Sequence, residues 1–351
     1  MTGAGMMDCK KALVETDGDI NAAVSVLKEK GLAKAAKKAG RIAAEGLVRI
    51  AISEDGKTAA IVEVNSETDF VAKNEEFVTF VEELAKLALS AESDDIEAFK
   101  AMSFGEATVQ DELNNKIAKI GENMSVRRIA KVSGDVVSSY IHGGGRIGVM
   151  VVGNGEGTDE IKAALTNIAM QVAAMSPQYV KREDISAEEL EQLRREVEGS
   201  ALNDPFTLPK PILNGLLDKA VDGVWDQEDI DILAEKRADK GFNFNYLPNF
   251  LSEGAKAKLA ALAVADRDAI VENKIFGGLL EGRISKQLKE ICLMDQVYVR
   301  AEDGKQTVAK YLESVSKDLS LANVVRFAVG EGIEKKEEDF AAEVAAQMAG
   351  N

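Results

Sequence analysis

The sequence is poor in the residue types on which most active sites depend. Its 351 residues include one histidine, His142, and two cysteines, Cys9 and Cys292, which lie far apart in the chain. Zinc sites and Ser-His-Asp or Cys-His arrangements need several such side chains close together, so they are hard to build here. Two cysteines are also too few for a disulfide framework, which fits a reducing cytosol. We therefore expect no enzymatic active site and no metal site.

Long apolar runs are also missing. No stretch approaches the roughly 18 apolar residues that a membrane-spanning helix requires, so we expect no membrane association. The segment Met1–Gly5 has no basic flank followed by an apolar run, and this pattern argues against a signal peptide. Together with the cysteine count, these absences predict a cytoplasmic protein.

Positive charge is scarce, since 43 basic residues stand against 60 acidic ones and the formal net charge is −17. Nucleic-acid affinity depends mainly on neutralising phosphates with lysine and arginine, so we expect no direct binding to nucleic acid. An acidic chain instead suits docking onto a basic protein surface. Residues 28–41 differ, with six basic residues and one acidic residue. They form either a nucleic-acid or ribosome patch or, as the acidity of the rest favours, a solvated linker helix.

One weak nucleotide-binding pattern occurs. Gly143-Gly144-Gly145-Arg146-Ile147-Gly148 satisfies the G-x-G-x-x-G pattern. In dinucleotide-binding proteins this pattern opens a helix whose N-terminus holds the pyrophosphate, but here Val149–Val152 continues as a strand. We therefore predict a hairpin turn and not a cofactor loop. The G-x-x-x-x-G-K-[ST] pattern is absent, so we expect no bound GTP and no cofactor.

A repeated order of elements dominates the middle of the chain. Each copy comprises a β-hairpin, an amphipathic helix and a closing strand. In the first copy we predict strands at 46–52 and 58–65, a helix capped by Asn74 and a closing strand at 126–130. In the second copy we predict strands at 136–142 and 147–152, a helix capped by Thr158 and a closing strand at 324–329. The repeat predicts an α+β fold with two related α+β core subdomains, each containing an antiparallel sheet.

The remaining segments are helical in pattern. Near the N-terminus we predict one helix at Met6–Glu15 and a second that Asp19 caps and that ends at Lys30. Charged residues with helical spacing fill 186–290, which indicates a helical insertion before the last closing strand. The tail, 335–351, has apolar residues at a spacing of four, which is typical of a short helix.

The most unusual local feature joins the second strand of the first copy to its helix. The segment reads Asn65-Ser66-Glu67-Thr68-Asp69-Phe70-Val71-Ala72-Lys73-Asn74. On local pattern alone, Phe70 is a core residue and Asp69 a helix cap. The alternative is that Phe70, beside an acidic residue at a loop–helix junction, is an anchor that enters a partner's pocket.

At several blocks the sequence resembles the elongation factor Ts family. Thr2–Leu13 is similar to that family's N-terminal signature, and Thr68-Asp69-Phe70-Val71 to its second signature. Further blocks of the family occur in the expected order at Lys119–Asn123, Ile141–Gly143 and Val329–Lys335. The resemblance covers Thr2 to about Tyr179 and about Ile270 to the end. It favours the anchor interpretation of Phe70 over the core interpretation.

The resemblance implies an organisation similar to the one predicted from the residues. Its regions would be a ubiquitin-associated-like helical domain with a linker (1–40), a first core subdomain (41–135), a second core subdomain (136–180 and 291–334), a helical dimerisation-type insertion (181–290) and a C-terminal helical module (335–351). The family's usual first helix precedes the Thr2–Gly5 block, where this chain has only Met1, so we expect that helix to be missing. We also expect an enlarged insertion, because about 203–268 has no counterpart in the common family pattern. This part is either an enlarged dimerisation element, giving a homodimer, or a separate partner site.

In function, the resemblance implies a guanine-nucleotide exchange factor with no active site of its own. Its partner would be elongation factor Tu, both GDP-bound and nucleotide-free, and it would promote GDP release by disturbing the magnesium and phosphate site. Asp69 and Phe70, flanked by Thr68 and Val71, would press into the G domain beside the magnesium ion. The other implied contacts are Met6, Met7 and Lys10 with a G-domain helix, Ile120 and Gly121 in the core contact, and His142 and Val299 with another domain of the partner.

Two other functions stay open on the residues alone. A pure binding adaptor would use the N-terminal helices, so it would lose function on mutation of Met6 or Met7 and keep it without Phe70. An enzyme would rest on carboxylates, although no pair stands out among the 60 acidic residues. That hypothesis predicts turnover of a small substrate by the isolated chain.

Overall fold

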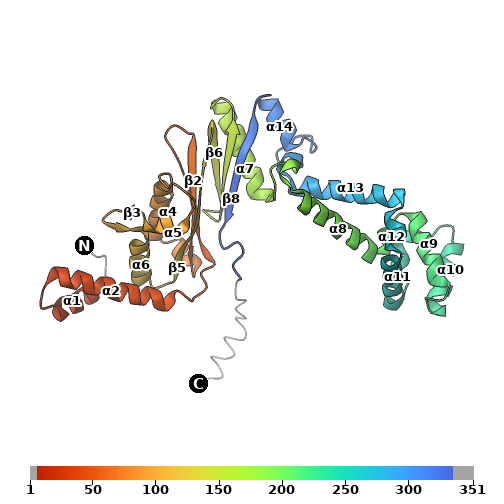
Figure 1. The fold of residues 1–351 in the computed structure, drawn as a ribbon, viewed down its shortest axis with the longest axis horizontal. Helices are drawn as coiled ribbons and strands as arrows, with labels where there is room; N and C mark the ends of the chain where they lie inside the picture. Colours follow the sequence, from red (N-terminus) through yellow and green to blue (C-terminus); the bar gives the residue numbers. More distant parts are fainter. Residues whose placement is uncertain (1–5, 335–351) are drawn as a thin grey trace, which may run out of the picture. The chain divides into compact units, whose positions relative to one another are not determined.

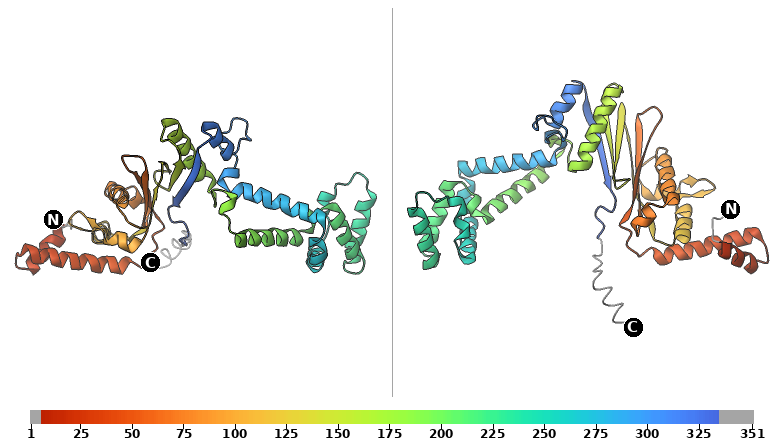
Figure 2. Two further views of the ribbon diagram at one scale, coloured as in Figure 1. Left: turned by 45° about the horizontal axis from the view of Figure 1, so that its top comes forward. Right: turned by 180° about the vertical axis from the view of Figure 1, so that it is seen from behind.

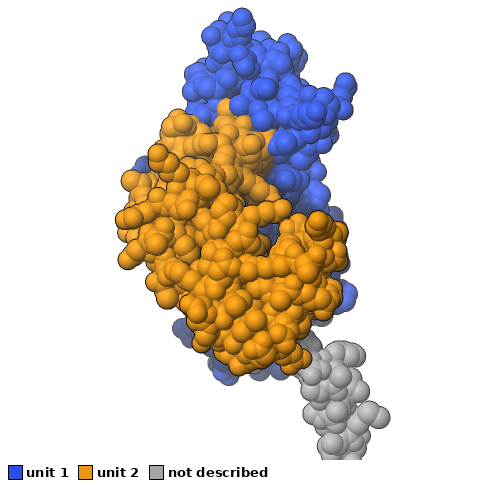
Figure 3. Space-filling view, turned by 90° about the vertical axis from the view of Figure 1, so that its right-hand side faces the viewer, with its two compact units in different colours: residues 1–176, 297–351 blue, residues 177–296 orange. Residues whose placement is uncertain are grey.

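The structure of the chain, a computed structural model, describes residues 6–334. It divides into two compact units (Figure 3): unit 1 comprises residues 1–176 and 297–351, and unit 2 comprises residues 177–296. The predicted insertion, 181–290, falls inside unit 2. The predicted helix at 335–351 and the Thr2–Gly5 part of the N-terminal block lie outside the described residues.

Unit 1 contains two three-stranded antiparallel sheets (Figure 1). The first has the order β1 (Glu45–Ile52), β2 (Thr58–Ser66), β5 (Met124–Ser133), and the second β6 (Val136–His142), β7 (Ile147–Asn154), β8 (Ser320–Ala328). The predicted strands agree with these within a few residues at each end. The α+β fold class, with antiparallel sheets and N-terminal helices, is therefore confirmed.

Each sheet is covered by one of the two amphipathic helices that the sequence analysis predicted. The Asn74 side chain accepts hydrogen bonds from two backbone N–H groups and so begins α4 (Glu75–Ala88), whose apolar face packs on β1 and β2. Phe77 and Phe80 of that face are buried, and full burial of such a side chain contributes roughly 1.5–3 kcal/mol. Thr158 caps α7 (Asp159–Met175), which packs against β6 and β7 (Figure 2). α14 (Val308–Val315) packs against α7 in turn.

Between α4 and β5 the chain forms elements that the sequence analysis did not assign. These are α5 (Ile96–Ala101), the short strands β3 (Ser103–Phe104) and β4 (Ala107–Thr108), and α6 (Val109–Ile120). α6 begins at a capping box between Thr108 and Asp111 and ends at Gly121, whose φ of 92° closes the helix in the left-handed conformation. Its buried residues join the core beneath α4.

The N-terminal helices are α1 (Met6–Glu15), as predicted, and α2 (Ile20–Lys38), which Asp19 caps. The predicted end of α2 at Lys30 is wrong, because the helix continues for two more turns. The cause is tertiary packing: Gly31 is buried, and a Cβ placed there would lie 3.8 Å from Ala118 of α6. A close helix–helix contact thus outweighs the low helix propensity of glycine.

The named elements of unit 2 are all helices, joined by loops and one isolated β-bridge between Tyr179 and Cys292, and its core is made of its own residues. Its α-helices are α8 (Ala187–Asn203), α9 (Lys210–Val221), α10 (Gln227–Ala238), α11 (Glu253–Ala265), α12 (Arg267–Val271) and α13 (Lys274–Ile291), with short 3-10 helices at Arg182–Asp184 (η1), Pro205–Thr207 (η2), Phe244–Asn249 (η3) and Leu293–Asp295 (η4). Trp225 is buried in this core and donates its indole N–H to the Ala255 carbonyl, 3.0 Å away. Within the described part of the chain, no helix is long and apolar enough to cross a membrane.

Candidate functional site

The segment after β2 turns outward through a helix of one turn, α3 (Asp69–Ala72). Two adjacent apolar residues of this helix have opposite environments: Val71 is 6% exposed and anchors the helix to the core, whereas Phe70 is 80% exposed. The core interpretation of Phe70 is therefore wrong. The interpretation of Asp69 as the cap is also wrong, because Thr68 is the cap residue, its hydroxyl accepting from the Val71 N–H at 3.5 Å.

The base of α3 is tied to the end of α6. The Glu122 carboxylate accepts hydrogen bonds from the Thr68 N–H at 3.0 Å and from the Thr68 hydroxyl at 2.7 Å. One residue further on, the Asn123 N–H donates to the Glu67 carboxylate. Two loops separated by more than fifty residues thus hold each other, so Phe70 projects from a fixed base. Ile120 is partly buried against the same core, and Gly121 begins the loop.

Asp69 carries its charge beside Phe70. Lys73, one turn along, donates to the Asp69 carboxylate at 2.6 Å, and this bond holds the pKa of Asp69 below its usual value. The charge of Arg146, from the β6–β7 turn, lowers that pKa in the same direction. The exposed face of α3 therefore presents an aromatic ring next to a carboxylate that stays ionised at neutral pH.

The β6–β7 turn lies against β1. Its Gly145 carbonyl accepts from the Val48 N–H at 2.8 Å, and the Arg49 guanidinium donates to the Gly144 carbonyl at 3.1 Å. Gly145 has a φ of 114°, which residues with a Cβ rarely adopt, and a Cβ there would lie 3.1 Å from the Val48 carbonyl oxygen, so the position favours glycine. The predicted hairpin turn is confirmed: the glycine pattern leads into β7 and not into a helix.

His142 ends β6 at this turn. It is exposed, and its Nδ1 lies 3.2 Å from the Tyr140 hydroxyl. On the far side of the turn, Arg146 pairs with Glu45 at 3.0 Å. The turn, the start of β1 and α3 thus form one face of unit 1, which we term the tip face: Glu45, Thr68–Val71, His142 and Arg146.

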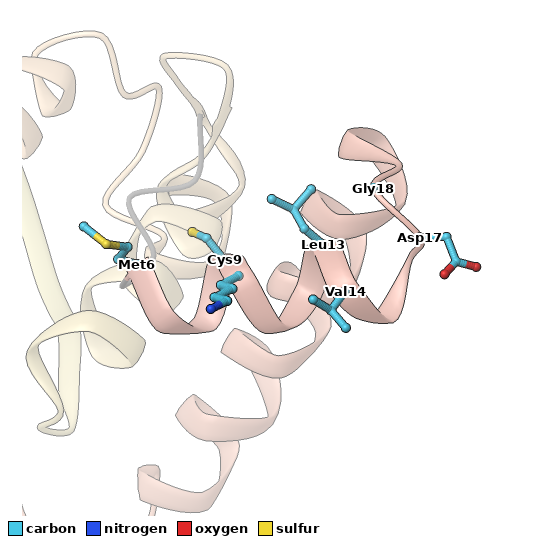
Figure 4. Close-up of a pocket in the computed structure, with 7 residues that line it drawn as sticks. Met6, Cys9, Leu13, Val14, Asp17 and Gly18 are labelled. Carbon is cyan, nitrogen blue, oxygen red and sulfur yellow. The ribbon is translucent and has the colours of Figure 1, made fainter.

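The other predicted contact residues lie on α1 and on the segment before α14. Met6 is 87% exposed, and Met7 and Lys10 are exposed as well. A concavity of about 600 Å³ runs along this helix (Figure 4), lined by Met6, Cys9, Lys10, Leu13, Val14, Asp17 and Gly18. Val299 is half-exposed, and its N–H donates to the Gln171 side chain at 2.8 Å. In the structure, Ile120 and Gly121 end the helix whose following residue, Glu122, bonds the base of α3. Met6, Met7 and Lys10 lie on α1, and Val299 lies on the segment before α14.

The sequence analysis missed several residues that shape the tip face. Lys73 lies four positions after Asp69, a spacing at which helix residues form ion pairs, so the sequence carried a signal for it. Glu122, Arg49 and Arg146 act across long sequence separations, and no local pattern marks them. Among residues 6–334, no group of three or more histidine, cysteine, aspartate or glutamate side chains could hold a metal ion.

Comparison with known proteins places this geometry in context. A family model described as Elongation factor TS matches residues 67–331, which include α3, α6, β5 and the whole second sheet, whereas β1 and β2 precede the matched range. The chain is 42% identical over 352 residues to Elongation factor Ts of Clostridioides difficile (strain 630), covering 99% of this chain and 95% of that protein. It is 42% identical over 358 residues to Elongation factor Ts of Clostridium tetani (strain Massachusetts / E88), covering 99% and 96%. Elongation factor Ts of Clostridium botulinum (strain Eklund 17B / Type B) is 41% identical over 355 residues.

Proposed function

The chain belongs to the elongation factor Ts family, whose members are translation elongation factors, and we propose that it is a guanine-nucleotide exchange factor for elongation factor Tu. It binds the GDP-bound partner in the cytoplasm and promotes GDP release. One observation carries the proposal: Phe70 is held in the solvent, beside an ionised carboxylate, on a short helix whose base is fixed.

An exposed aromatic ring on a fixed base is suited to enter a partner's pocket. Burying a phenylalanine removes enough apolar surface to contribute roughly 1.5–3 kcal/mol, provided that little ordering is needed on binding. The hydrogen bonds from Thr68 to Glu122 and the buried Val71 order α3 before the partner arrives. Much of the ring's burial energy is therefore available to displace groups of the partner.

GDP in such a GTPase is held by phosphate contacts and by a divalent cation, which is often the largest charge in the site. A wedge of Phe70 and Asp69 beside that cation disturbs the groups that position it, so the phosphates lose their hold while the base is untouched. Coupling of this kind is reciprocal: GDP weakens binding of the exchange factor by the ratio in which the factor weakens binding of GDP. Excess GTP then completes the exchange, and no covalent bond is made or broken.

The remaining contacts extend this wedge. In the proposal, Ile120 and Gly121 lie in the same contact as α3, and His142 and Val299 meet a second domain of the partner. Met6, Met7 and Lys10, on the ubiquitin-associated-like helices, meet a helix of the G domain. Unit 2 acts apart from the exchange, as the dimerisation element of a homodimer.

Release of a fluorescent GDP analogue from purified elongation factor Tu tests the proposal. We expect the chain at a catalytic amount to accelerate release, with the rate saturating as the concentration of loaded Tu increases. Circular dichroism on the same sample establishes that the chain is folded. A folded chain that leaves the release rate unchanged at every concentration would refute the proposed function.

A further inference from the structure

A buried amide on α7 forms hydrogen bonds with the backbone of a short segment of unit 1, Val297–Val299. The Gln171 side chain is 0% exposed, lying on the face of α7 that also buries Ile168 and Val172. Its Nε2 donates to the Val297 carbonyl at 3.1 Å, and its Oε1 accepts from the Val299 N–H at 2.8 Å. One side chain thus bonds a C=O and an N–H two residues apart, as a neighbouring strand would.

The other edge of the segment is bonded too. The Tyr298 N–H donates to the Gln306 carbonyl at 2.9 Å, and Val297 forms a β-bridge with Thr307. The Tyr298 ring is buried and stacks on Tyr311, with 4.0 Å between the ring centroids. Val297 and Val299 flank this buried ring, and Val299 begins a turn in which the Ala301 N–H donates to the Tyr298 carbonyl at 2.9 Å. Both valines are 49% exposed.

Burying an amide at position 171 costs free energy of desolvation. A primary amide in an apolar interior costs free energy unless its hydrogen bonds are made, and a leucine would fill the same face without that cost. Two hydrogen bonds of Gln171 are made to the backbone of the segment that carries the two valines. Gln171 therefore fixes the backbone of this segment by hydrogen bonds, which an aliphatic side chain could not make.

We infer that Gln171 is a positioning residue that presents Val297 and Val299 as a fixed apolar pair to elongation factor Tu. The inference rests on the proposed function and adds Gln171 and Val297 to it. Valine has a single strongly restricted side-chain torsion, and the backbone of this segment is already bonded on both edges. Binding through this pair thus requires little further ordering, which is how a small contact contributes to affinity.

Gln171→Met tests the inference because methionine has a similar length and can make neither hydrogen bond. We expect the dissociation constant for nucleotide-free elongation factor Tu to rise roughly fivefold to tenfold, the effect of losing a moderate interface contact. The GDP-release rate at saturating concentration should be unchanged, because the wedge is untouched. Ser138→Ala is the matched control: it removes a buried 3.0 Å bond from β6 to the Lys162 carbonyl of α7 and should leave the dissociation constant unchanged.

A double-mutant cycle separates positioning from stability. When Val297→Ala and Val299→Ala are already present, adding Gln171→Met should weaken binding no further. All three substitutions act on the same contact with elongation factor Tu, and the valine substitutions have already removed it. Fully additive losses, or a Gln171→Met variant that binds as tightly as the unaltered chain, would overturn the inference. If the unaltered chain neither binds Tu nor releases GDP, the proposed function fails and the inference falls with it.

Amide hydrogen exchange gives a readout that does not depend on the partner. The Val299 N–H should exchange slowly in the unaltered chain and much faster in Gln171→Met, whereas the Tyr298 N–H, bonded to Gln306, should change less. If the Val299 N–H has the same hydrogen-exchange rate in both proteins, the inference is overturned, even when the rate of GDP release is normal.

Discussion

The Glu122 carboxylate bonds both the backbone N–H and the hydroxyl of Thr68, at 3.0 and 2.7 Å, and so joins the end of α6 to the start of the helix that carries Phe70. The two residues are far apart in the sequence, and each would be an unremarkable polar residue alone. Their pairing explains how a helix of a single turn keeps a fixed orientation while its aromatic side chain lies in solvent. The proposed wedge depends on this pairing as much as on the ring.

Glu122→Ala should therefore impair exchange although Glu122 is not the wedge. Loss of two hydrogen bonds to a partly buried carboxylate should lower the free energy of unfolding by about 1–3 kcal/mol. GDP release at a fixed concentration should slow roughly tenfold, because α3 must now be ordered on binding. Glu83→Ala, an exposed glutamate on α4, is the control and should change neither quantity. Normal GDP release by Glu122→Ala would show that α3 needs no support from α6.

A buried carboxylate also predicts an effect on stability. The Glu63 side chain is fully buried and accepts from Arg127 at 3.1 Å, from the Gly330 N–H at 2.8 Å and from Arg128. It thereby connects β2 and β5 to the turn after β8. Glu63→Gln removes the counter-charge of Arg127 and leaves Arg128 paired with Glu331 alone, so the free energy of unfolding should fall by about 1.5–3 kcal/mol, the contribution of hydrogen bonds to a charged group.

Urea denaturation measures this change. Glu82→Gln is the comparison, since Glu82 is exposed and pairs with Arg49 at 3.4 Å, and its loss should cost less than about 1 kcal/mol. Equal midpoints for the two variants would mean that the buried network contributes no more than a surface pair.

The ion pairs of Glu76 lead us to expect that the free energy of unfolding falls as the pH becomes acidic. Its carboxylate accepts from Lys116 at 2.9 Å and from Lys119, and these bonds hold the pKa of Glu76 below its ordinary value of 4.5. A pKa that is lower in the folded state stabilises the fold above the unfolded value, and the stabilisation is lost as pH falls through the folded value. The stability difference between the unaltered chain and Glu76→Gln should therefore be constant near neutral pH and shrink as pH falls below about 4.5.

Thermal unfolding of both proteins across that range checks the prediction. A difference that grows on acidification would mean that the carboxylate is destabilised, and not stabilised, by its surroundings.

Unit 2 predicts an effect on self-association. Tyr246 and Phe250 lie four residues apart in the enlarged insertion and are both exposed, whereas Phe242 and Phe244 nearby pack on the core of unit 2. If unit 2 is the dimerisation element, replacing Tyr246 and Phe250 by serine should shift the mass measured by light scattering from dimer towards monomer. GDP release should be unchanged, since every proposed contact with Tu lies in unit 1. A monomeric unaltered chain would contradict the dimer proposal.

The sheets and their covering helices were predictable because their signals are local. Short runs rich in apolar residues and bounded by turn residues mark β1, β2, β6 and β7, and Asn74 and Thr158 mark the starts of α4 and α7. α6 carried a comparable signal, with Thr108 and Asp111 in capping positions and buried residues at 109, 113 and 117, and the sequence analysis overlooked it. The sequence analysis favoured a solvated linker helix over residues 28–41, but no local pattern showed that this helix continues α2 or that Gly31 is buried near Ala118.

The site was less predictable for a physical reason. A helix of one turn has no periodicity, so local pattern could not decide whether Phe70 or Val71 is buried. The resemblance to a known family indicated that Phe70 is exposed, and the structure shows it. The support of α3 comes from Glu122, whose hydrogen bonds to Thr68 exist only after the end of α6 has packed beside the end of β2. Sequence therefore indicated the wedge but not what holds it.

The most direct test of the account compares Phe70→Ala with Ile52→Ala in release of a fluorescent GDP analogue from elongation factor Tu. Ile52 is a second exposed apolar residue of unit 1, at the far end of β1 from Glu45, and serves as the control. The account predicts that Phe70→Ala slows release at least tenfold, equivalent to about 1.4 kcal/mol or more, with an unchanged unfolding midpoint, and that Ile52→Ala has no effect on release. Unimpaired release by a folded Phe70→Ala variant would contradict the wedge mechanism.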